Sequence, residues 1–405
     1  MTVRPFLVSS PGKVILFGEH AVVYGKSAVA ASIGLRAYLL FQPTQDHQVR
    51  IRFPDILLDQ SFAQDDIPLL PVYEQHPSES EHHFSHLLAG FSDNARVAIL
   101  AFLCLYSHIG FEYEQAHPNA PPKYGFTIHI KSFIPVGAGL GSSAAFSVCI
   151  ATALLRHFDH SSLDNSSPGL PASTLSTINN WAFRMEQVTH GQPSGVDNTI
   201  AVYGGAKLYR KGQEVENLEG FSSMRFLLTN TRVPKNTKKM VANVAQFRNK
   251  YPAVVDPLLE AINGIAHSFK ELVSGNPSQL NASLAELVTM NQSLLSVLGV
   301  SHQTLDTLCQ VTSCQQLPSK LTGAGGGGCA LTWVPPSTTP DTIAQVKRDL
   351  KTLGYITYDT DIGGPGVQAC DISTDVQHAT SIFLHSDSLC EPDTELLERL
   401  KWTSI

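Results

Sequence analysis

A glycine-rich segment between a predicted strand and a predicted helix is the most informative chemical feature of the sequence. It reads Pro135-Val136-Gly137-Ala138-Gly139-Leu140-Gly141-Ser142-Ser143-Ala144-Ala145. Alternate glycines let the backbone adopt positive φ and approach a ligand closely. The following helix offers free N–H groups at the positive end of its dipole, and the hydroxyls of Ser142 and Ser143 can contact phosphate or Mg²⁺. The segment predicts a phosphate-binding loop, with a serine-capped tight turn as the alternative.

Two further segments combine polar side chains with glycines beside apolar runs. The first extends from Pro11 to Gly25, where Lys13, Glu19 and His20 could supply a positive charge, a hydrogen-bond acceptor and a donor. The second, Lys320 to Cys329, has five glycines in six positions before a predicted strand, as expected where the backbone approaches a ligand. Taken singly, each segment is also compatible with an ordinary loop or hairpin.

Mixed helices and strands are predicted around these segments. The expected strands are 14–17, 35–42, 124–133, 224–229, 329–334 and 355–358, and the expected helices are 95–106, 142–155, 175–188, 237–248, 254–273, 280–298, 302–311 and 341–353. We expect residues 54–86 to be mostly irregular and residues 157–173 to form a surface loop. Because strands and helices do not alternate regularly, the pattern favours an α+β fold.

The composition is that of a globular chain with two or three domains. Its 405 residues are 43% hydrophobic and 16% charged, which excludes a disordered protein. A net charge of −7 argues against a general nucleic-acid binder, which would need a basic face. The longest apolar run, Val97 to Tyr106, is about half of a membrane span. With no signal-peptide pattern and an odd number of cysteines, seven, we expect a cytoplasmic protein without membrane partners.

Together the three segments resemble the motifs of the GHMP kinase superfamily. Residues 137–143 are similar to its phosphate loop, and residues 323–328 to its third motif. The segment Lys13 to Gly25 is similar to the opening of mevalonate kinases, whereas galactokinases tend to carry Arg in place of Lys13 and Thr-Asp after the Glu-His. Glu186 and the segment 190–198, His-Gly-Gln-Pro-Ser-Gly-Val-Asp-Asn, add to the resemblance.

The resemblance covers about residues 5–370 and implies the two-domain GHMP kinase architecture. We expect an N-terminal domain similar to domain 2 of ribosomal protein S5 over residues 5–222. A ferredoxin-like C-terminal domain is expected over residues 223–375, followed by a tail over residues 376–405. The active site is expected in the cleft between the two domains.

The resemblance also implies catalytic roles. Phosphoryl transfer from ATP needs a phosphate cradle, a metal ion and an activated hydroxyl. Asp197 is the candidate base for the substrate hydroxyl, and Lys13 would hold Asp197 and the alcohol together and balance the developing charge. Mg²⁺ prefers hard oxygen ligands, and the family pattern points to Ser143 and Glu186. Considered alone, Glu186 could be an exposed helix residue and Asp197 a helix cap.

The remaining candidates form two groups by expected ligand. The ATP-binding group is Lys13, Ser132, Pro135, Gly137, Ala138, Gly139, Leu140, Gly141, Ser142 and Ser143. The substrate-binding group is Glu19, His20, Ser194, Gly195, Asp197, Tyr203 and Thr237. Asp55 stands where some family members have Asn near the adenine, so the base pocket is not assigned, and neither is a cation for a substrate carboxylate.

The expected activity is ATP-dependent, Mg²⁺-requiring phosphorylation of mevalonate to 5-phosphomevalonate in isoprenoid and sterol biosynthesis. The family also suggests a homodimer that is inhibited by prenyl diphosphates competing with ATP. One alternative is another GHMP small-molecule kinase, such as phosphomevalonate kinase or galactokinase, although we find no Lys/Arg cluster for a second phosphate group beside the acceptor residues. A non-catalytic ligand sensor is the other alternative, but Lys13, Ser143, Glu186 and Asp197 are all present.

Overall fold

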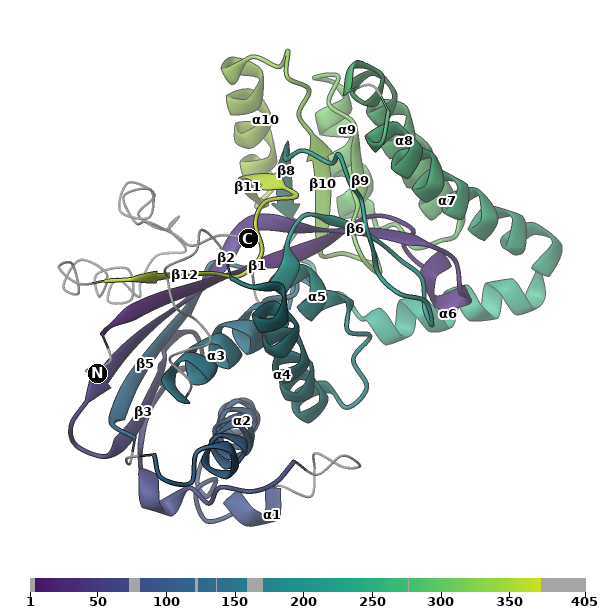
Figure 1. Ribbon diagram of the computed structural model, residues 1–405. Helices are drawn as coiled ribbons and strands as arrows, with labels where there is room; N and C mark the ends of the chain where they lie inside the picture. The colour runs from purple at the N-terminus through teal and green to yellow at the C-terminus, as the bar shows by residue number, and fades with distance from the viewer. Residues whose placement is uncertain are drawn as a thin grey trace.

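The computed structural model describes residues 4–72, 81–120, 123–135, 137–158, 170–275 and 277–372. Strands and helices build two adjoining halves, one from the N-terminal and one from the C-terminal part of the chain (Figure 1). The expected α+β class is therefore confirmed. The predicted tail, 376–405, and most of the predicted loop, 157–173, lie outside the described residues.

A mixed sheet forms the first half. Its main strands are β1 (Phe6–Phe17), β2 (Ala28–Thr44), β3 (Gln48–Phe53), β4 (Leu58–Ala63) and β5 (Gly125–Ser132). They are ordered β4-β3-β5-β2, with β1 also paired to β2; β3 and β5 run parallel, and the other neighbours are antiparallel. Val49, Ile51 and Phe53 are buried and alternate with partly exposed residues, which is the two-residue period of a strand with one covered face.

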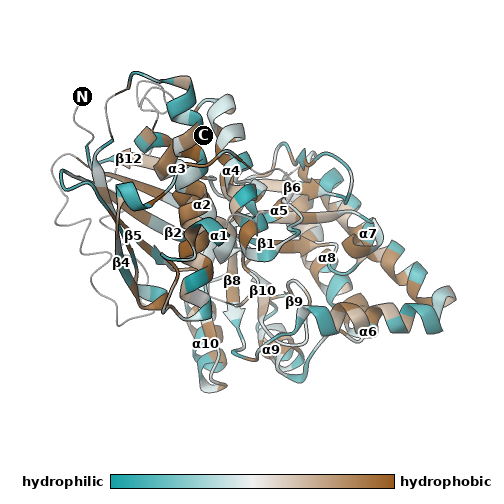
Figure 2. Ribbon diagram, turned by 90° about the horizontal axis from the view of Figure 1, so that it is seen from below, coloured by the Kyte–Doolittle hydropathy of each residue, from teal (hydrophilic) through white to brown (hydrophobic). Residues whose placement is uncertain are grey.

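Helices cover one face of this sheet (Figure 1). They are α2 (Asp93–Ala116), α3 (Ser142–Phe158), α4 (Ala172–His190) and α5 (Val196–Tyr203), after the short α1 (Glu81–Phe84). Helices α3 and α5 contact β1 and β2, and α2 and α4 pack against α3. Small buried residues such as Ala145, Cys149 and Thr152 let α3 lie close to the strands. Figure 2 shows hydrophobic residues of the strands, α2 and α3 gathered in this core.

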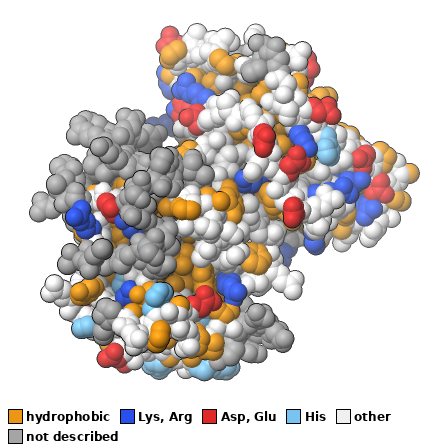
Figure 3. Space-filling view, viewed as in Figure 1, with side chains coloured by type: hydrophobic (Ala, Val, Ile, Leu, Met, Phe, Trp, Pro, Cys, Tyr) orange, Lys and Arg blue, Asp and Glu red, His pale blue; other side chains and the backbone are white. Residues whose placement is uncertain are grey.

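The second half is a four-stranded antiparallel sheet with helices. Strands β8 (Met224–Asn230), β9 (Ser319–Leu321), β10 (Cys329–Trp333) and β11 (Ile356–Ile362) are ordered β11-β8-β10-β9. This is the 4-1-3-2 order of a ferredoxin-like sheet, as expected. The helices are α6 (Thr237–Lys250), α7 (Pro252–Val273), α8 (Pro277–Val297), α9 (Gln303–Ser313) and α10 (Pro340–Thr352). Acidic and basic side chains gather on the surface where α6 meets α7 (Figure 3).

The two halves are joined by the sheet and by the last described strand. Ile33 of β2 pairs with Ile362 of β11, and β12 (Gln368–Asp371) returns to pair with β1. The buried guanidinium of Arg36 donates hydrogen bonds to the carbonyl oxygens of Pro365, at 2.9 Å, and Gly366, at 2.6 Å. Arg36 on β2 therefore binds the segment that leads into β12 to the N-terminal sheet.

Short strands are the main departure from the sequence prediction. β3, β9, β12, β6 (Ala206–Tyr209) and β7 (Glu216–Asn217) are not predicted, and residues 54–72 contain β4 and 3₁₀ turns instead of irregular chain alone. Strands β6, β7, β9 and β12 have only two to four residues, too few for an apolar pattern to show a period. β3 does alternate, but over six residues only. Pairing with longer strands stabilises them, as β6 pairs with the first residues of β2.

Helix α2 is longer than predicted. It begins at Asp93 and continues past Tyr106 to Ala116, because Ser107 and His108 interrupt the apolar run without ending the helix. The buried Ser107 hydroxyl donates a hydrogen bond to the carbonyl of Pro68. The helical segment Ala95–Ala116 has the length and hydropathy of a membrane span, unlike the shorter apolar run recognised in the sequence. However, 72% of its most apolar window is buried inside the protein. The helix therefore lies in the core of the first half.

Candidate active site

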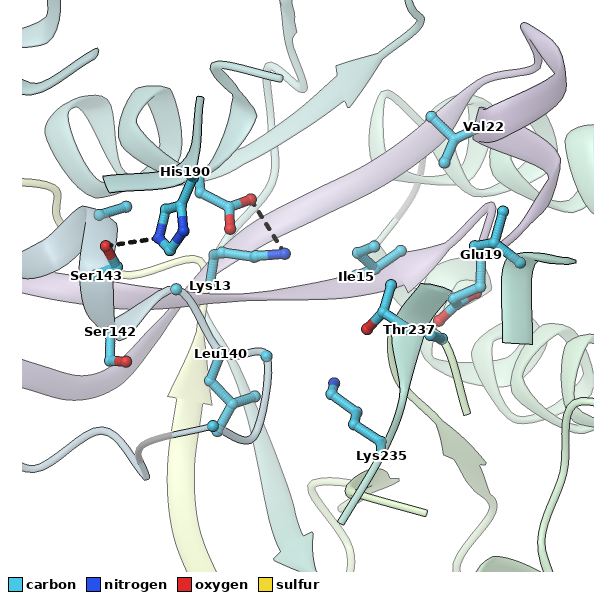
Figure 4. Close-up of a pocket in the computed structure, with 18 of the residues that line it drawn as sticks. Lys13, Ile15, Glu19, Val22, Leu140, Ser142, Ser143, His190, Lys235 and Thr237 are labelled. Atoms are coloured by element: carbon cyan, nitrogen blue, oxygen red, sulfur yellow. Dashed lines mark hydrogen bonds and ion pairs between the residues drawn. The ribbon is translucent and has the colours of Figure 1, made fainter. Parts of the chain in front are cut away.

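A cavity of about 600 Å³ brings the three sequence motifs together (Figure 4). It opens between the end of β1, the N-terminus of α3 and the start of α6. Its lining residues are Lys13, Ile15, Glu19, His20, Val22, Val23, Gly137, Gly139, Leu140, Gly141, Ser142, Ser143, Ala144, Glu186, His190, Asp197, Lys235, Thr237, Val241, Gly323 and Ala324. The cavity therefore draws residues from both halves of the molecule.

The predicted phosphate loop lies along one wall of the cavity. Gly137, Gly139 and Gly141 all have positive φ, between 73° and 75°, a conformation that other residues adopt at a cost. The carbonyl of Leu140 accepts a hydrogen bond at 2.8 Å from the backbone N–H of Lys13, so the loop is anchored on β1. Helix α3 begins directly after the loop, at Ser142, and free N–H groups at a helix N-terminus attract anions.

Lys13 and Asp197 form an ion pair at the cavity. The Lys13 Nζ to Asp197 Oδ1 distance is 3.1 Å, and the side chains have exposed fractions of 13% and 34%; the dashed line from Lys13 in Figure 4 marks this pair. Lys13 lies on β1, whereas Asp197 lies in the first turn of α5. The turn before α5 ends at Gly195 with φ 79°, which lets the chain turn back so that Asp197 faces β1.

Ser143, Glu186 and His190 form a second polar group beside the loop. The Ser143 hydroxyl donates to Glu186 Oε1 at 2.8 Å, and His190 Nε2 lies 3.0 Å from the same hydroxyl oxygen. Because a hydroxyl has one hydrogen, the His190 ring donates to Ser143. Burial raises the pKa of Glu186; the Ser143 hydrogen bond opposes this, and the charge of Asp197 adds to it.

This oxygen pair is chemically suited to Mg²⁺. Carboxylate and hydroxyl oxygens are hard ligands, and Mg²⁺ usually takes one or two protein carboxylates together with phosphate oxygens and waters. Within the described ranges, no group of three or more His, Cys, Asp or Glu side chains could hold a metal. A metal at Ser143 and Glu186 would therefore depend on oxygens from a bound ligand.

Glu19 and His20 lie at the cavity but are already engaged with the C-terminal half. The Glu19 carboxylate accepts hydrogen bonds from Lys320 Nζ and, at 3.0 Å, from Asn291 Nδ2. It is fully buried, as is Lys320; burial raises the pKa of Glu19 and lowers that of Lys320. His20 has a φ of 60°, and its Nε2 lies 2.9 Å from the carbonyl oxygen of Ala324. The Glu19 carboxylate is thus already bonded inside the protein, and its expected contact with a substrate stays a prediction.

Six predicted site residues do not line this cavity. Ala138, within the phosphate loop, is buried. The backbone N–H of Ser132 donates to Asp55 Oδ2 at 2.8 Å, and Pro135 lies just before the loop. Gly195 caps α5, and Ser194 precedes it. Tyr203, at the end of α5, has the Lys207 ammonium 5.4 Å from its ring centre. Thr237, in contrast, lines the cavity at the first residue of α6.

Sequence reasoning passed over Lys235, His190 and Lys320. Two of them stand inside motif segments: His190 begins the segment 190–198, at the end of α4, and Lys320 begins the third motif. Their local signal is a charged residue close to glycines, whereas Lys235, two residues before Thr237, has no glycine near it in the sequence. Lys320 lies 301 residues from its partner Glu19, a separation that residue spacing does not reveal.

Family models match both halves of the chain. The model of the GHMP kinases N terminal domain matches residues 100–205, and the model of the GHMP kinases C terminal domain matches residues 270–356. The first match contains the phosphate loop, Glu186 and Asp197, and the second contains the third glycine-rich turn. Lys13 lies before the first match and Lys235 between the two.

Relatives are similar over nearly the whole chain. The mevalonate kinase of Mus musculus is 40% identical over 387 residues, covering 91% of this chain and 95% of the relative. The mevalonate kinase of Homo sapiens is 40% identical over 401 residues, covering 92% and 98%. Among solved structures, that of the Methanococcus jannaschii mevalonate kinase has a TM-score of 0.67 at 24% identity and covers 88% of this chain and 98% of its own. That likeness supports the fold.

Proposed function

Because the chain belongs to the mevalonate kinases of the GHMP kinase family, we propose that its cavity binds ATP and mevalonate and transfers a phosphoryl group between them. The product is 5-phosphomevalonate, a precursor for isoprenoid and sterol synthesis. The main support for this proposal is that one cavity contains the phosphate loop, the Lys13–Asp197 pair and the Ser143–Glu186 pair.

Asp197 and Lys13 are the residues to which we assign the chemistry. The Asp197 carboxylate accepts the proton of the C5 hydroxyl of mevalonate. The hydroxyl oxygen bonds to the γ-phosphorus, and the bond from that phosphorus to the bridging oxygen breaks, which leaves ADP. The ammonium of Lys13, 3.1 Å from the carboxylate, holds Asp197 toward the hydroxyl and balances the charge that develops.

The phosphate loop and the start of α3 are assigned to the nucleotide. Backbone N–H groups of Gly137 to Ser143 would donate to the phosphates, as helix N-termini do for anions. Ser143 and Glu186 would hold Mg²⁺, which supplies positive charge to the phosphates when it is bound. We expect that EDTA abolishes activity and that added Mg²⁺ restores it; activity that persists in EDTA would contradict this assignment.

The acceptor side of the cavity is assigned to His20 and Thr237. In this proposal Glu19 acts indirectly, because its carboxylate bonds Lys320 and Asn291 and so holds the neighbouring His20 in place. Ser194 and Gly195 would likewise act by positioning Asp197 at the start of α5. The cavity does not include Tyr203, Ser132 or Pro135. Their predicted contacts require that ATP or mevalonate extends beyond it.

A coupled ADP-release assay with a panel of acceptors tests the proposed function. The panel is mevalonate, phosphomevalonate, homoserine and galactose, each with ATP and Mg²⁺. We expect mevalonate to be phosphorylated far faster than the others. Fastest turnover of phosphomevalonate or galactose would assign the chain to another GHMP kinase activity. No turnover with any acceptor, despite ATP binding, would indicate a ligand sensor.

Inhibition by prenyl diphosphates is also proposed. The diphosphate of farnesyl or geranylgeranyl diphosphate would occupy the cradle of Gly137 to Ser143, so these compounds should compete with ATP. Steady-state inhibition at several ATP concentrations tests this, and inhibition that ATP does not relieve would point to a separate site.

Assembly, compartment and domain limits complete the proposal. We assign a homodimer, supported by exposed apolar residues on α7 and α8: Val254, Met290 and Val297. Light scattering of the purified protein would show the dimer or contradict it.

We also assign a cytoplasmic location, which cell fractionation would test. The domains are assigned to residues 5–222 and 223–375, and limited proteolysis would test whether the chain is cut between them.

A further inference from the structure

One lysine of the cavity has no role in the chemistry assigned above. Lys235 lies in the segment between β8 and α6, so it comes from the C-terminal half of the molecule. Figure 4 shows its side chain reaching into the cavity from below Thr237, on the same side as Leu140 of the phosphate loop. The lysine thus extends from one half of the molecule to a loop of the other half.

Glycines of both glycine-rich turns make room for this side chain. A Cβ atom added to Gly139 would lie 2.8 Å from Lys235 Cε and nearer still to Nζ. A Cβ atom on Gly323 would lie 3.3 Å from Nζ, and one on Gly328 would lie 3.0 Å from Cδ. The separations at Gly139 are shorter than real Cβ atoms show, and those at Gly323 and Gly328 are tighter than most real Cβ contacts. The two turns therefore form a slot that the lysine fills, with its ammonium at Gly139.

The ammonium in this slot is not neutralised by a direct partner. Among the described residues, Lys235 has neither a hydrogen bond nor an ion pair; the Asp197 carboxylate is paired with Lys13 instead. Burial lowers the pKa of Lys235, and the charge of Lys13 lowers it further, whereas Cys329 and Asp197 raise it. A half-buried cation without a partner is costly, and an anionic ligand would offset this cost.

We propose that Lys235 binds an anionic oxygen of the terminal phosphates of the nucleotide, as a cation that the C-terminal half adds to the phosphate loop. The inference rests on the proposed function, because the loop holds phosphates only if the cavity binds ATP. Lys13 and Lys235 would then flank the reacting phosphate from β1 and from the segment before α6. A lysine serves phosphates as a compact point charge.

The position of the Lys235 ammonium favours a phosphate of the nucleotide as its ligand, and not the carboxylate of the acceptor. Its nearest feature is Gly139, in the middle of the loop, whereas proton transfer is assigned to Asp197 on α5. Both anions would nevertheless be attracted to a lysine, so the experiment must separate them. Nucleotides that differ only in their phosphates do so, because adenosine, AMP, ADP and ATP share one base and one sugar.

The test measures the binding of these four nucleotides by isothermal titration calorimetry to the whole protein. The variants are Lys235→Met, Lys235→Arg and, as a matched control, Lys238→Met, which removes an exposed lysine of α6. A hydrogen bond to a charged group contributes about 1.5–3 kcal/mol, so Lys235→Met should weaken ATP binding by roughly 10- to 100-fold. Adenosine should bind as before, Lys235→Arg should recover most of the loss, and Lys238→Met should resemble the unchanged protein.

Each other outcome overturns the inference in its own way. Equal losses for adenosine and ATP would make Lys235 a structural residue of the slot. Unchanged ATP binding with a raised KM for mevalonate would assign the lysine to the acceptor carboxylate. If the unchanged protein bound no ATP at all, the proposed function itself would fail, which is a result distinct from the first two.

Discussion

Two lysine–carboxylate pairs lie near the end of β1, and they differ in what surrounds them. Lys13 and Asp197 face the cavity, with exposed fractions of 13% and 34%. Glu19 and Lys320 are buried, at 0% and 1%. The Glu19 carboxylate also accepts a hydrogen bond from Asn291, and Lys320 also donates to the carbonyl of Leu321.

The two pairs differ in whether a substrate can reach the carboxylate. Only the carboxylate of the first pair is accessible from the cavity. Asp197 lines the cavity, so in the proposed function a substrate hydroxyl would reach its carboxylate, a contact that proton transfer needs. Glu19 offers no such access, and its bonds join the end of β1 to β9 and α8 of the other half. Removing two ions from water costs several kcal/mol each, and the extra hydrogen bonds offset that cost. We infer that the first pair serves chemistry and the second serves the fit of the two halves.

The largest effect is expected from Asp197→Asn. The substitution keeps the shape of the side chain but removes the base, so kcat should fall by roughly 10²–10⁴. The KM for ATP should change little, which indicates an interaction made in the transition state. Asp256→Asn, in an exposed ion pair with Arg248, is the matched control and should retain normal kcat. Near-normal turnover of Asp197→Asn would make Asp197 a helix cap instead.

Lys320→Met should act on stability. It leaves the Glu19 carboxylate buried without its cation, so the free energy of unfolding should fall by about 3–5 kcal/mol in denaturant titrations. The control is Lys26→Met, which breaks an exposed pair with Glu260 and should cost no more than about 1 kcal/mol. Adding Glu19→Gln to Lys320→Met should regain part of the loss, because no buried charge remains. Equal losses for the two lysines would contradict the contrast.

A smaller effect is expected from Glu186→Gln, which tests the metal proposal beside the reacting pair. Loss of a residue that only hydrogen-bonds to a metal ligand typically weakens metal affinity by roughly 10- to 100-fold. Loss of a direct carboxylate ligand should therefore raise the Mg²⁺ concentration for half-maximal activity by at least that factor. Glu214→Gln, at an exposed position, should leave the Mg²⁺ titration unchanged. An unchanged titration for Glu186→Gln as well would remove this carboxylate from the metal site.

Features that depend on neighbouring residues could be predicted from the sequence. The phosphate loop is an example: alternate glycines require positive φ, and the structure has it at Gly137, Gly139 and Gly141. The helices of the second half begin and end close to their predicted limits for the same reason, since apolar periodicity and caps are local signals.

Partners far apart in the chain could not be predicted in this way. The family resemblance groups Glu19 with the substrate-binding residues, but the sequence does not show that its carboxylate bonds to Lys320, 301 residues away. The role proposed for Lys235 depends on the space left by Gly139 and Gly323, which lie in two motifs distant in the sequence. Short strands such as β7 and β9 form only because a neighbouring strand pairs with them.

A double-mutant cycle on Lys13 and Asp197 tests most directly whether the exposed pair works as one chemical unit. The measurement compares kcat for Lys13→Met, Asp197→Asn and the double variant, with the free energy of unfolding recorded for each. In the proposed function both residues act on the same developing charge, so the double variant should lose less than the product of the two single losses, while stability changes little. Losses that multiply, or unfolding that accounts for the loss of activity, would contradict the account.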